Sequence, residues 1–192
     1  MIAKNNLFPV FLKLETLSIL MVGGGRVALE KLSAILCNSP QTKIKLVAKE
    51  INQDVMEQAI RHTNLRVIQK AFEAKDLDDM DLIFVAVNDR AVSSSIMQTA
   101  HAKGKLVNVA DTPDLCDFYL GSIVKKGNLK IGISTNGQSP TAAKRIKEML
   151  NEALPDELDE LIENLHTIRN QLTGDFRDKV KMLNEITRGL VE

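Results

Sequence analysis

The feature that most constrains the fold of this chain is an apolar run that ends in three consecutive glycines. Residues 17–22 read Leu-Ser-Ile-Leu-Met-Val and lead into Gly23, Gly24 and Gly25, after which the sequence takes on helical periodicity. This order predicts a strand, a tight turn and the start of a helix. With Ala28 in third place, the segment matches the G-x-G-x-x-G/A pattern of a dinucleotide-binding turn.

Each small residue of that pattern has a physical role. Gly23 permits the sharp turn, and Gly25 lets a pyrophosphate approach the backbone without meeting a Cβ atom. Ala28 lets the helix lie close to the strand. The N–H groups of the first helical turn then hold the anion. Glycine-rich turns are common, so a purely structural turn remains the alternative interpretation.

Strand and helix patterns alternate through the next eighty residues. Apolar, β-rich segments occur at residues 44–48, 65–68, 82–87 and 105–109. One helical pattern begins directly after Gly25, and two more span about 53–62 and 91–103. Residues 74–77 leave room for another crossover helix. This alternation predicts an α/β fold with a Rossmann-like, doubly wound parallel sheet. We assign residues 1–112 to this NAD-binding domain.

The pattern changes after Asp111. Residues 121–125 and 129–134 flank a Lys-Gly-Asn turn and predict a hairpin, followed by a helix to about Leu154 with Ser139 as N-cap and Pro140 at its first position. We assign residues 113–150 to a separate, small antiparallel/α subdomain. Amphipathic patterns at 158–172 and 176–190, separated by Gly174, predict a C-terminal helical domain over 151–192.

Composition narrows the classes of function. The 192 residues include 25 basic and 25 acidic side chains, and this zero net charge argues against a nucleic-acid partner. Cys37 and Cys116 are far apart and predict ordinary reduced thiols, and His62, His101 and His166 form no ligand pair, so no metal site is expected. With no membrane-length apolar run and no secretory pattern, we expect a cytoplasmic protein without a membrane partner.

Polar residues follow the second and fourth predicted strands, where a dinucleotide is expected. Glu50 is a candidate acceptor for ribose hydroxyls, whereas Lys49 favours a 2′-phosphate, so NAD and NADP both remain open. Asn88 and Asp89 lie where a nicotinamide or ribose would rest. For Asp89, capping of the following helix is the equal alternative.

Two further segments bear on the chemistry. Asp111 follows the fifth strand, just before a proline-containing turn, and is either a turn-forming residue or a proton-transfer carboxylate. The polar loop 134–141 ends at a helix N-terminus, where an anion can bind. Lys144 and Arg145 lie close behind; they serve an anionic partner or simply reach solvent.

Together these residues resemble the precorrin-2 dehydrogenase family, which includes the dehydrogenase portion of siroheme synthases. The matching blocks occur in the family's order at residues 8–12, 22–28, 86–89, 108–113 and 133–140. The resemblance implies NAD-dependent oxidation of precorrin-2 to sirohydrochlorin, a step toward siroheme or cobalamin. It also implies a homodimer built on the antiparallel subdomain and the helical tail, with residues 113–150 as the dimerisation and substrate subdomain. Ala48-Lys49-Glu50-Ile51 departs from the family's usual Ser-Pro-Glu turn.

Residue by residue, the resemblance implies that Asp111 is the catalytic aspartate and that Ser139 lies in the tetrapyrrole pocket. It places Arg26, Val27, Lys49 and Glu50 at the NAD. The predicted substrate contacts are Asn108, Ser139, Lys144 and Arg145, with Lys125 and Lys130 as further cations for the substrate's carboxylates. No methyltransferase half follows the tail, so methylation is expected of another protein. Iron or cobalt insertion by the same carboxylate, and a non-catalytic nucleotide-sensing module, are the competing hypotheses.

Overall fold

The computed structural model describes residues 5–172 and 175–188, which form two compact units. Residues 10–120 make the first unit, and the other described residues make the second. The three-part division expected from the sequence stays a prediction. No helix within the described ranges combines the length and the apolar character that crossing a membrane requires.

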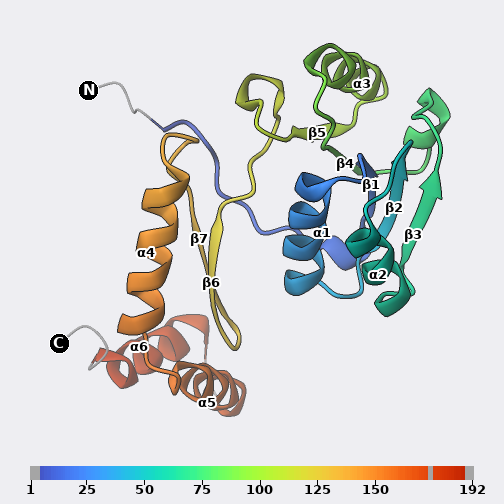
Figure 1. Cartoon of the computed structure of the whole chain (residues 1–192). Helices are drawn as coiled ribbons and strands as arrows, with labels where there is room; N and C mark the ends of the chain where they lie inside the picture. The colour runs from blue at the N-terminus through green and yellow to red at the C-terminus, as the bar shows by residue number, and fades with distance from the viewer. Residues whose placement is uncertain (1–4, 173–174, 189–192) are drawn as a thin grey trace. The chain divides into compact units, whose positions relative to one another are not determined.

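The first unit is built on a five-stranded parallel sheet with the order β3-β2-β1-β4-β5 (Figure 1). Its strands are β1 (Ser18–Val22), β2 (Lys43–Ala48), β3 (Leu65–Gln69), β4 (Leu82–Val85) and β5 (Leu106–Val109). The central strands β1 and β4 are short, apolar and largely buried on both faces, as parallel strands covered by helices must be. The predicted Rossmann-like α/β fold is confirmed.

Helices cover both faces of this sheet. On one face lie α1 (Arg26–Asn38) and α2 (Gln53–Arg61), which bury Ala28, Leu32 and Val55 against Met21, Leu46 and Phe84. On the other lies α3 (Arg90–Ala102), which buries Ile96 and Ala100. The short helices η1 (Leu14–Thr16), η2 (Ala74–Leu77) and η3 (Pro113–Leu115) complete the unit. The crossover segment at residues 74–77 is thus a single 3₁₀ turn.

The strand order places the ligand-binding edge. Because β1 pairs with β2 on one side and β4 on the other, the direction of winding reverses between β1 and β4. Ligands of open α/β sheets bind outside the carboxyl ends of the strands at this reversal. The segments that leave β1, β2, β4 and β5 at this edge include the glycine turn and most of the candidate site residues.

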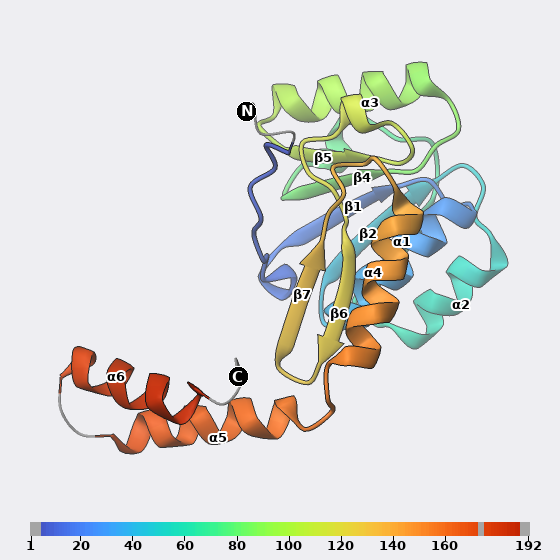
Figure 2. The ribbon, with the colours of Figure 1, turned by 90° about the vertical axis from the view of Figure 1, so that its left-hand side faces the viewer.

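The second unit contains the predicted hairpin and the helical tail. Strands β6 (Ser122–Lys126) and β7 (Leu129–Ile133) are antiparallel, and α4 (Pro140–Ala153) packs along them (Figure 2). Helices α5 (Leu158–Gln171) and α6 (Phe176–Ile186) lie side by side. The structure therefore confirms the antiparallel/α subdomain and the helical tail, while Gly174 and residue 190 of the expected pattern lie outside the described residues.

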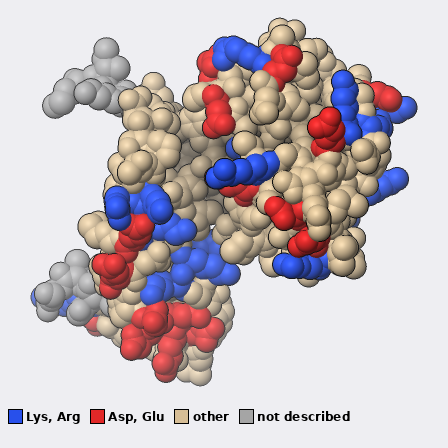
Figure 3. All heavy atoms as spheres, in the orientation of Figure 1, with Lys and Arg blue, Asp and Glu red and all other residues tan. Residues whose placement is uncertain are grey.

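The turn between β6 and β7 contacts α5 through Asp159. Gly127 has a φ of +53°, and a Cβ there would overlap the carboxylate of Asp159. One oxygen of that carboxylate accepts hydrogen bonds from the backbone N–H of Asn128 at 2.7 Å and from its side-chain amide at 2.9 Å. Asp159 and Glu160 stand in the first turn of α5, and acidic side chains gather over this helix on the surface (Figure 3).

Candidate functional site

The glycine turn is wedged between the backbone segments that follow β2 and β4. Gly23 has a φ of +120°, and a Cβ at this position would overlap the carbonyl oxygen of Ala86. A Cβ at Gly24 would overlap the carbonyl oxygen of Glu50. The turn is closed by the hydrogen bond from the N–H of Asn52 to the carbonyl of Gly24, at 2.8 Å. Gly23 thus has the predicted role in the turn. Gly24, predicted as one of the three cofactor-binding glycines, is also required by its contact with the backbone of Glu50.

Gly25 differs from its two neighbours. It is the N-cap of α1 and provides no side-chain hydrogen bond to the first turn, and a Cβ built on it would meet nothing within 4 Å. The N–H groups of a first helical turn have no partners within the helix. Arg26 and Val27 begin this turn, and Ala28 is fully buried beneath it. The open space before these N–H groups fits the pyrophosphate of a dinucleotide.

Lys49 and Glu50 leave β2 beside this turn. Both side chains are exposed, and the Glu50 backbone lies against Gly24. The carbonyl of Lys49 accepts a hydrogen bond from the side-chain amide of Gln69 at 3.1 Å, which ties this segment to the end of β3. The predicted ribose-binding carboxylate therefore belongs to the segment that packs on the glycine turn.

The residues after β4 serve the following helix. The strand ends at Val85, two residues earlier than expected, and Asn88 and Asp89 are exposed. Oδ1 of Asp89 accepts the N–H groups of Ala91 at 2.8 Å and Val92 at 3.1 Å, so it caps α3. The capping interpretation describes this side chain, and contact of Asn88 or Asp89 with a cofactor stays a prediction.

Asp111 stands directly beyond β5 in an unusual backbone conformation. Its φ is +53°, in the left-handed region that aspartate tolerates better than most residues, and its side chain is exposed. Strand pairing continues up to Ala110, whose N–H donates to Val85 at 2.8 Å, and η3 begins at Pro113. The carboxylate thus lies at a turn, as one interpretation expected, and is accessible, as the other requires.

A buried polar network lies beside Asp111. Lys31 Nζ on α1 donates to Oδ1 of Asn108 on β5 at 3.0 Å, and the Asn108 amide donates to the carbonyl of Phe118 at 2.7 Å. Asn108 is only 4% exposed. Both ends of its amide are thus engaged within the unit, and its contact with a substrate stays a prediction. The sequence gives no signal for this contact between α1 and β5.

The pKa values of Lys31 and Cys116 are both shifted in this network. Burial lowers the pKa of Lys31, against the opposing electrostatic effect of Cys116 first and then of Asp111 and Glu30. Burial likewise raises the pKa of the Cys116 thiol, which donates to the carbonyl of Val109 at 3.1 Å. Cys116 and Cys37 are free, as expected.

The remaining candidates belong to the second unit. Ser139 Oγ accepts the N–H of Ala142 at 3.1 Å and so caps α4, as predicted. The loop before it turns through Asn136 and Gly137, both with positive φ. Lys144 and Arg145 are exposed on α4, and Arg145 pairs with Glu148 at 2.8 Å. Their contacts with a substrate stay predictions.

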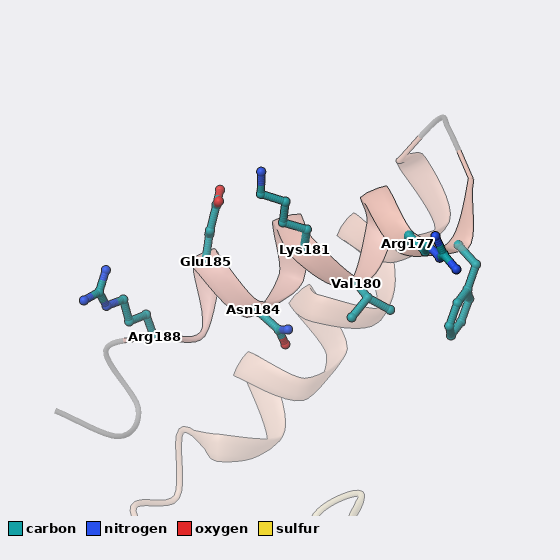
Figure 4. A pocket seen from close by; sticks show the side chains of 7 residues that line it. Arg177, Val180, Lys181, Asn184, Glu185 and Arg188 are labelled. Carbon is teal, nitrogen blue, oxygen red and sulfur yellow. The ribbon is translucent and has the colours of Figure 1, made fainter.

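A surface pocket of about 440 Å³ lies elsewhere in this unit, along α6 (Figure 4). Its lining combines an exposed phenylalanine with charged and polar side chains: Phe176, Arg177, Val180, Lys181, Asn184, Glu185 and Arg188. None of the candidate site residues lines it. Among the described residues, no three His, Cys, Asp or Glu side chains are grouped so as to hold a metal ion.

Two known protein families match consecutive parts of the chain. Residues 10–122 match the family described as "Putative NAD(P)-binding", and residues 126–153 match "Sirohaem biosynthesis protein central". A solved structure of SirC, a precorrin-2 dehydrogenase, has a TM-score of 0.74 and 28% identity and covers 94% of this chain and 89% of its own.

Curated relatives extend the likeness. The chain is 34% identical over 173 residues to the siroheme synthase of Methylococcus capsulatus and 32% identical over 176 residues to that of Neisseria meningitidis serogroup C. These alignments cover 90% and 92% of the chain but 34% of each relative, so the chain spans about a third of their length. The resemblance seen in the ordered sequence blocks is confirmed.

Proposed function

Because the chain belongs to the putative NAD(P)-binding family and is similar over most of its length to siroheme synthases and to a precorrin-2 dehydrogenase, we propose that it oxidises precorrin-2 to sirohydrochlorin with NAD. The observation that carries the proposal is the accessible carboxylate of Asp111, which leaves β5 at the sheet edge that also holds the glycine turn. A hydride acceptor and a base are the two groups that this dehydrogenation requires.

The chain's own residues divide this work. The glycine turn and the first N–H groups of α1, at Arg26 and Val27, hold the pyrophosphate, and Glu50 accepts from a ribose. The bound nicotinamide supplies the hydride acceptor. Asp111 takes up the proton that leaves the tetrapyrrole when the second hydrogen is removed.

The choice of NAD rather than NADP follows from Glu50. A carboxylate at the end of the second strand accepts ribose hydroxyls and repels a 2′-phosphate. Lys49 is the opposing charge at this position, so the preference is tested by measuring the dissociation constants of both nucleotides for the wild type and for Glu50→Gln. Tighter binding of NADP by the wild type would contradict the proposal.

The second unit provides the proposed site for the substrate's carboxylates and the proposed homodimer contact. The polar loop before Ser139, with Lys144 behind it, offers N–H groups and a cation to a multiply charged tetrapyrrole. The predicted cytoplasmic location belongs to the same proposal.

The decisive experiment incubates the protein anaerobically with precorrin-2 and NAD and follows NADH and sirohydrochlorin by absorbance. We expect both to appear together in the wild type. Asp111→Asn should lower turnover by about a hundredfold or more and leave nucleotide binding unchanged, because asparagine also tolerates the left-handed backbone.

The matched control is Asp79→Asn. Asp79 is also an exposed aspartate with a positive φ, of 60°, but it precedes β4 at the opposite edge of the sheet. This variant should keep wild-type turnover. Tight NAD binding by the wild type without consumption of the tetrapyrrole would favour the nucleotide-sensing module, and full activity of Asp111→Asn would remove that residue from the mechanism.

A further inference from the structure

Lys31 is a charged side chain on the sheet-facing side of α1 that the proposed chemistry does not use. It reaches from α1 to β5, where its ammonium donates to Oδ1 of Asn108 at 3.0 Å. Its neighbours on the helix, Ala28 and Leu32, are fully buried apolar residues. Taking an ammonium out of water costs free energy, which apolar side chains at such a position avoid.

Asn108, the partner of Lys31, lies on β5 and is tied to the segment that follows this strand. The Asn108 amide donates to the carbonyl of Phe118 at 2.7 Å, and the next residue, Val109, donates its N–H to Cys116 Sγ at 3.2 Å. The Phe118 ring packs edge-on against Phe84 on β4, with centroids 5.4 Å apart. Only Val109 and Ala110 separate Asn108 from Asp111.

We infer that Lys31 is a positioning residue, which fixes the end of β5, and with it the Asp111 carboxylate, relative to the glycine turn at the head of its own helix. One ammonium thereby connects the element that begins at the nucleotide turn with the strand that ends at the base. The inference rests on the proposed function, in which both ends of this connection act on one reaction.

The connection should weaken at alkaline pH. A hydrogen bond from a charged donor is roughly twice as strong as one from a neutral donor. Burial lowers the pKa of Lys31, and the groups that face it are Glu30 on α1, Asp111 after β5 and Cys116 after η3. Lys31 should therefore lose its charge at a lower pH than an exposed lysine, and the end of β5 should loosen in the same range.

The first test needs no substrate. In NMR titrations of the full chain, the Lys31 side chain should titrate below the usual range of a lysine, and the ¹³C signals of the backbone amide carbonyls of Asn108 and Asp111 should follow the same curve in the wild type but not in Lys31→Met. Amide signals that do not follow the titration would overturn the inference, whatever the protein catalyses.

The second test uses turnover. Relative to the wild type, Lys31→Met should lower kcat by about tenfold to a hundredfold with the dissociation constant of the nucleotide within about twofold, as expected for a displaced catalytic group. Lys31→Arg should recover most of the loss. The fall of kcat that we expect at alkaline pH in the wild type should be absent from Lys31→Arg, because the guanidinium keeps its charge. Lys43→Met, at an exposed lysine at the start of β2, is the control and should match the wild type.

Two outcomes would overturn the positioning role. One is wild-type kcat in Lys31→Met. The other is an equal loss in Lys31→Met and Lys31→Arg, accompanied by a fall in melting temperature, which a purely structural role predicts. A wild type that oxidises no tetrapyrrole would instead refute the proposed function, and the substrate-free titration would still decide whether Lys31 holds Asp111.

Discussion

Three adjacent glycines meet different physical demands. Gly23 is required by its backbone, since its φ of +120° is strained for any residue with a Cβ and the carbonyl of Ala86 fills the space beside it. Gly24 is required by its contact with the segment after β2. Gly25 has an ordinary φ of −88° and open space around it, so the fold alone does not require a glycine there.

This difference separates folding from binding. Gly25→Ala should change the free energy of unfolding by less than about 1 kcal/mol, because its conformation suits alanine and only a weak N-cap is replaced. It should nevertheless weaken nucleotide binding by about tenfold or more, because the new methyl group stands where the pyrophosphate approaches. Calorimetric titration with NAD and chemical denaturation measure the two effects.

Gly23→Ala is the matched comparison. The substitution adds the same methyl group but should destabilise the first unit by at least about 2 kcal/mol, through backbone strain and the clash with Ala86. Unchanged NAD affinity in Gly25→Ala would refute the assignment of the open space to the nucleotide.

The structural roles that the sequence predicted correctly are local ones. Gly23, Ala28 and Ser139 form a turn, a helix contact and an N-cap, and each depends on its immediate neighbours in the chain. The contact between Lys31 and Asn108 joins residues 77 positions apart. No periodicity in the sequence encodes it, because it depends on which strand the helix comes to lie over.

At the scale of elements, η2 and β2 are held together by a charged cluster around Asp76. This carboxylate is 5% exposed, and its oxygens lie 2.8 Å from Lys70 and 3.7 Å from Lys45. Asp76 also forms a capping box with Glu73 at the start of η2. A 3₁₀ turn of four residues has little intrinsic stability, so these side chains fix it.

The cluster predicts an acid-sensitive contribution to stability. Burial alone would raise the pKa of Asp76, but the hydrogen bond from Lys70, the N–H of Glu73 and the charges of Lys70 and Lys45 outweigh burial and hold this pKa below its usual value. The unfolded chain, with an aspartate pKa of about 3.9, therefore binds the proton first as the pH falls. The stabilisation is complete above that value and disappears as the pH drops through the lower folded pKa.

Asp76→Asn removes this contribution. We expect a loss of about 1–3 kcal/mol at neutral pH, because the buried hydrogen bonds lose their charge, and a shallower decline of stability below about pH 4 than in the wild type. Denaturation curves across this pH range test both effects. Glu57→Gln, which breaks an exposed pair with Arg61 on α2, is the control and should cost less than about 1 kcal/mol.

The order of elements was predictable because each strand and most helices carry their own pattern. All five parallel strands, the hairpin and the helices fall where apolar periodicity indicates them. The expected strand over 82–87 ends at Val85, because the backbone at Ala86 instead packs on Gly23. The apolar block at residues 8–12 lies outside the core, with Phe8 86% and Phe11 72% exposed.

At the scale of the whole molecule, the two units differ in how much they bury. The first has apolar clusters on both faces of its sheet. Among the described residues of the second, Val124 and Ala143 are the buried apolar side chains, and no described residue of α5 or α6 is buried. A two-stranded sheet with so small a core is marginally stable alone, which supports the predicted homodimer contact in this unit.

The exposed apolar side chains of α4 provide the test of that contact. Ile146 is 38% and Met149 58% exposed, and replacing both with glutamate places two charges in an interface that α4 would share with a second copy. We expect the wild type to be dimeric and Ile146→Glu/Met149→Glu to be monomeric in light scattering coupled to size-exclusion chromatography. The variant should still bind NAD, because the glycine turn belongs to the first unit.

The control is Lys147→Glu, which changes charge on the same helix at an exposed position and should remain dimeric. A monomeric wild type, or a double variant that stays dimeric, would remove α4 from the interface, and the marginal core of the second unit would then need another source of stability.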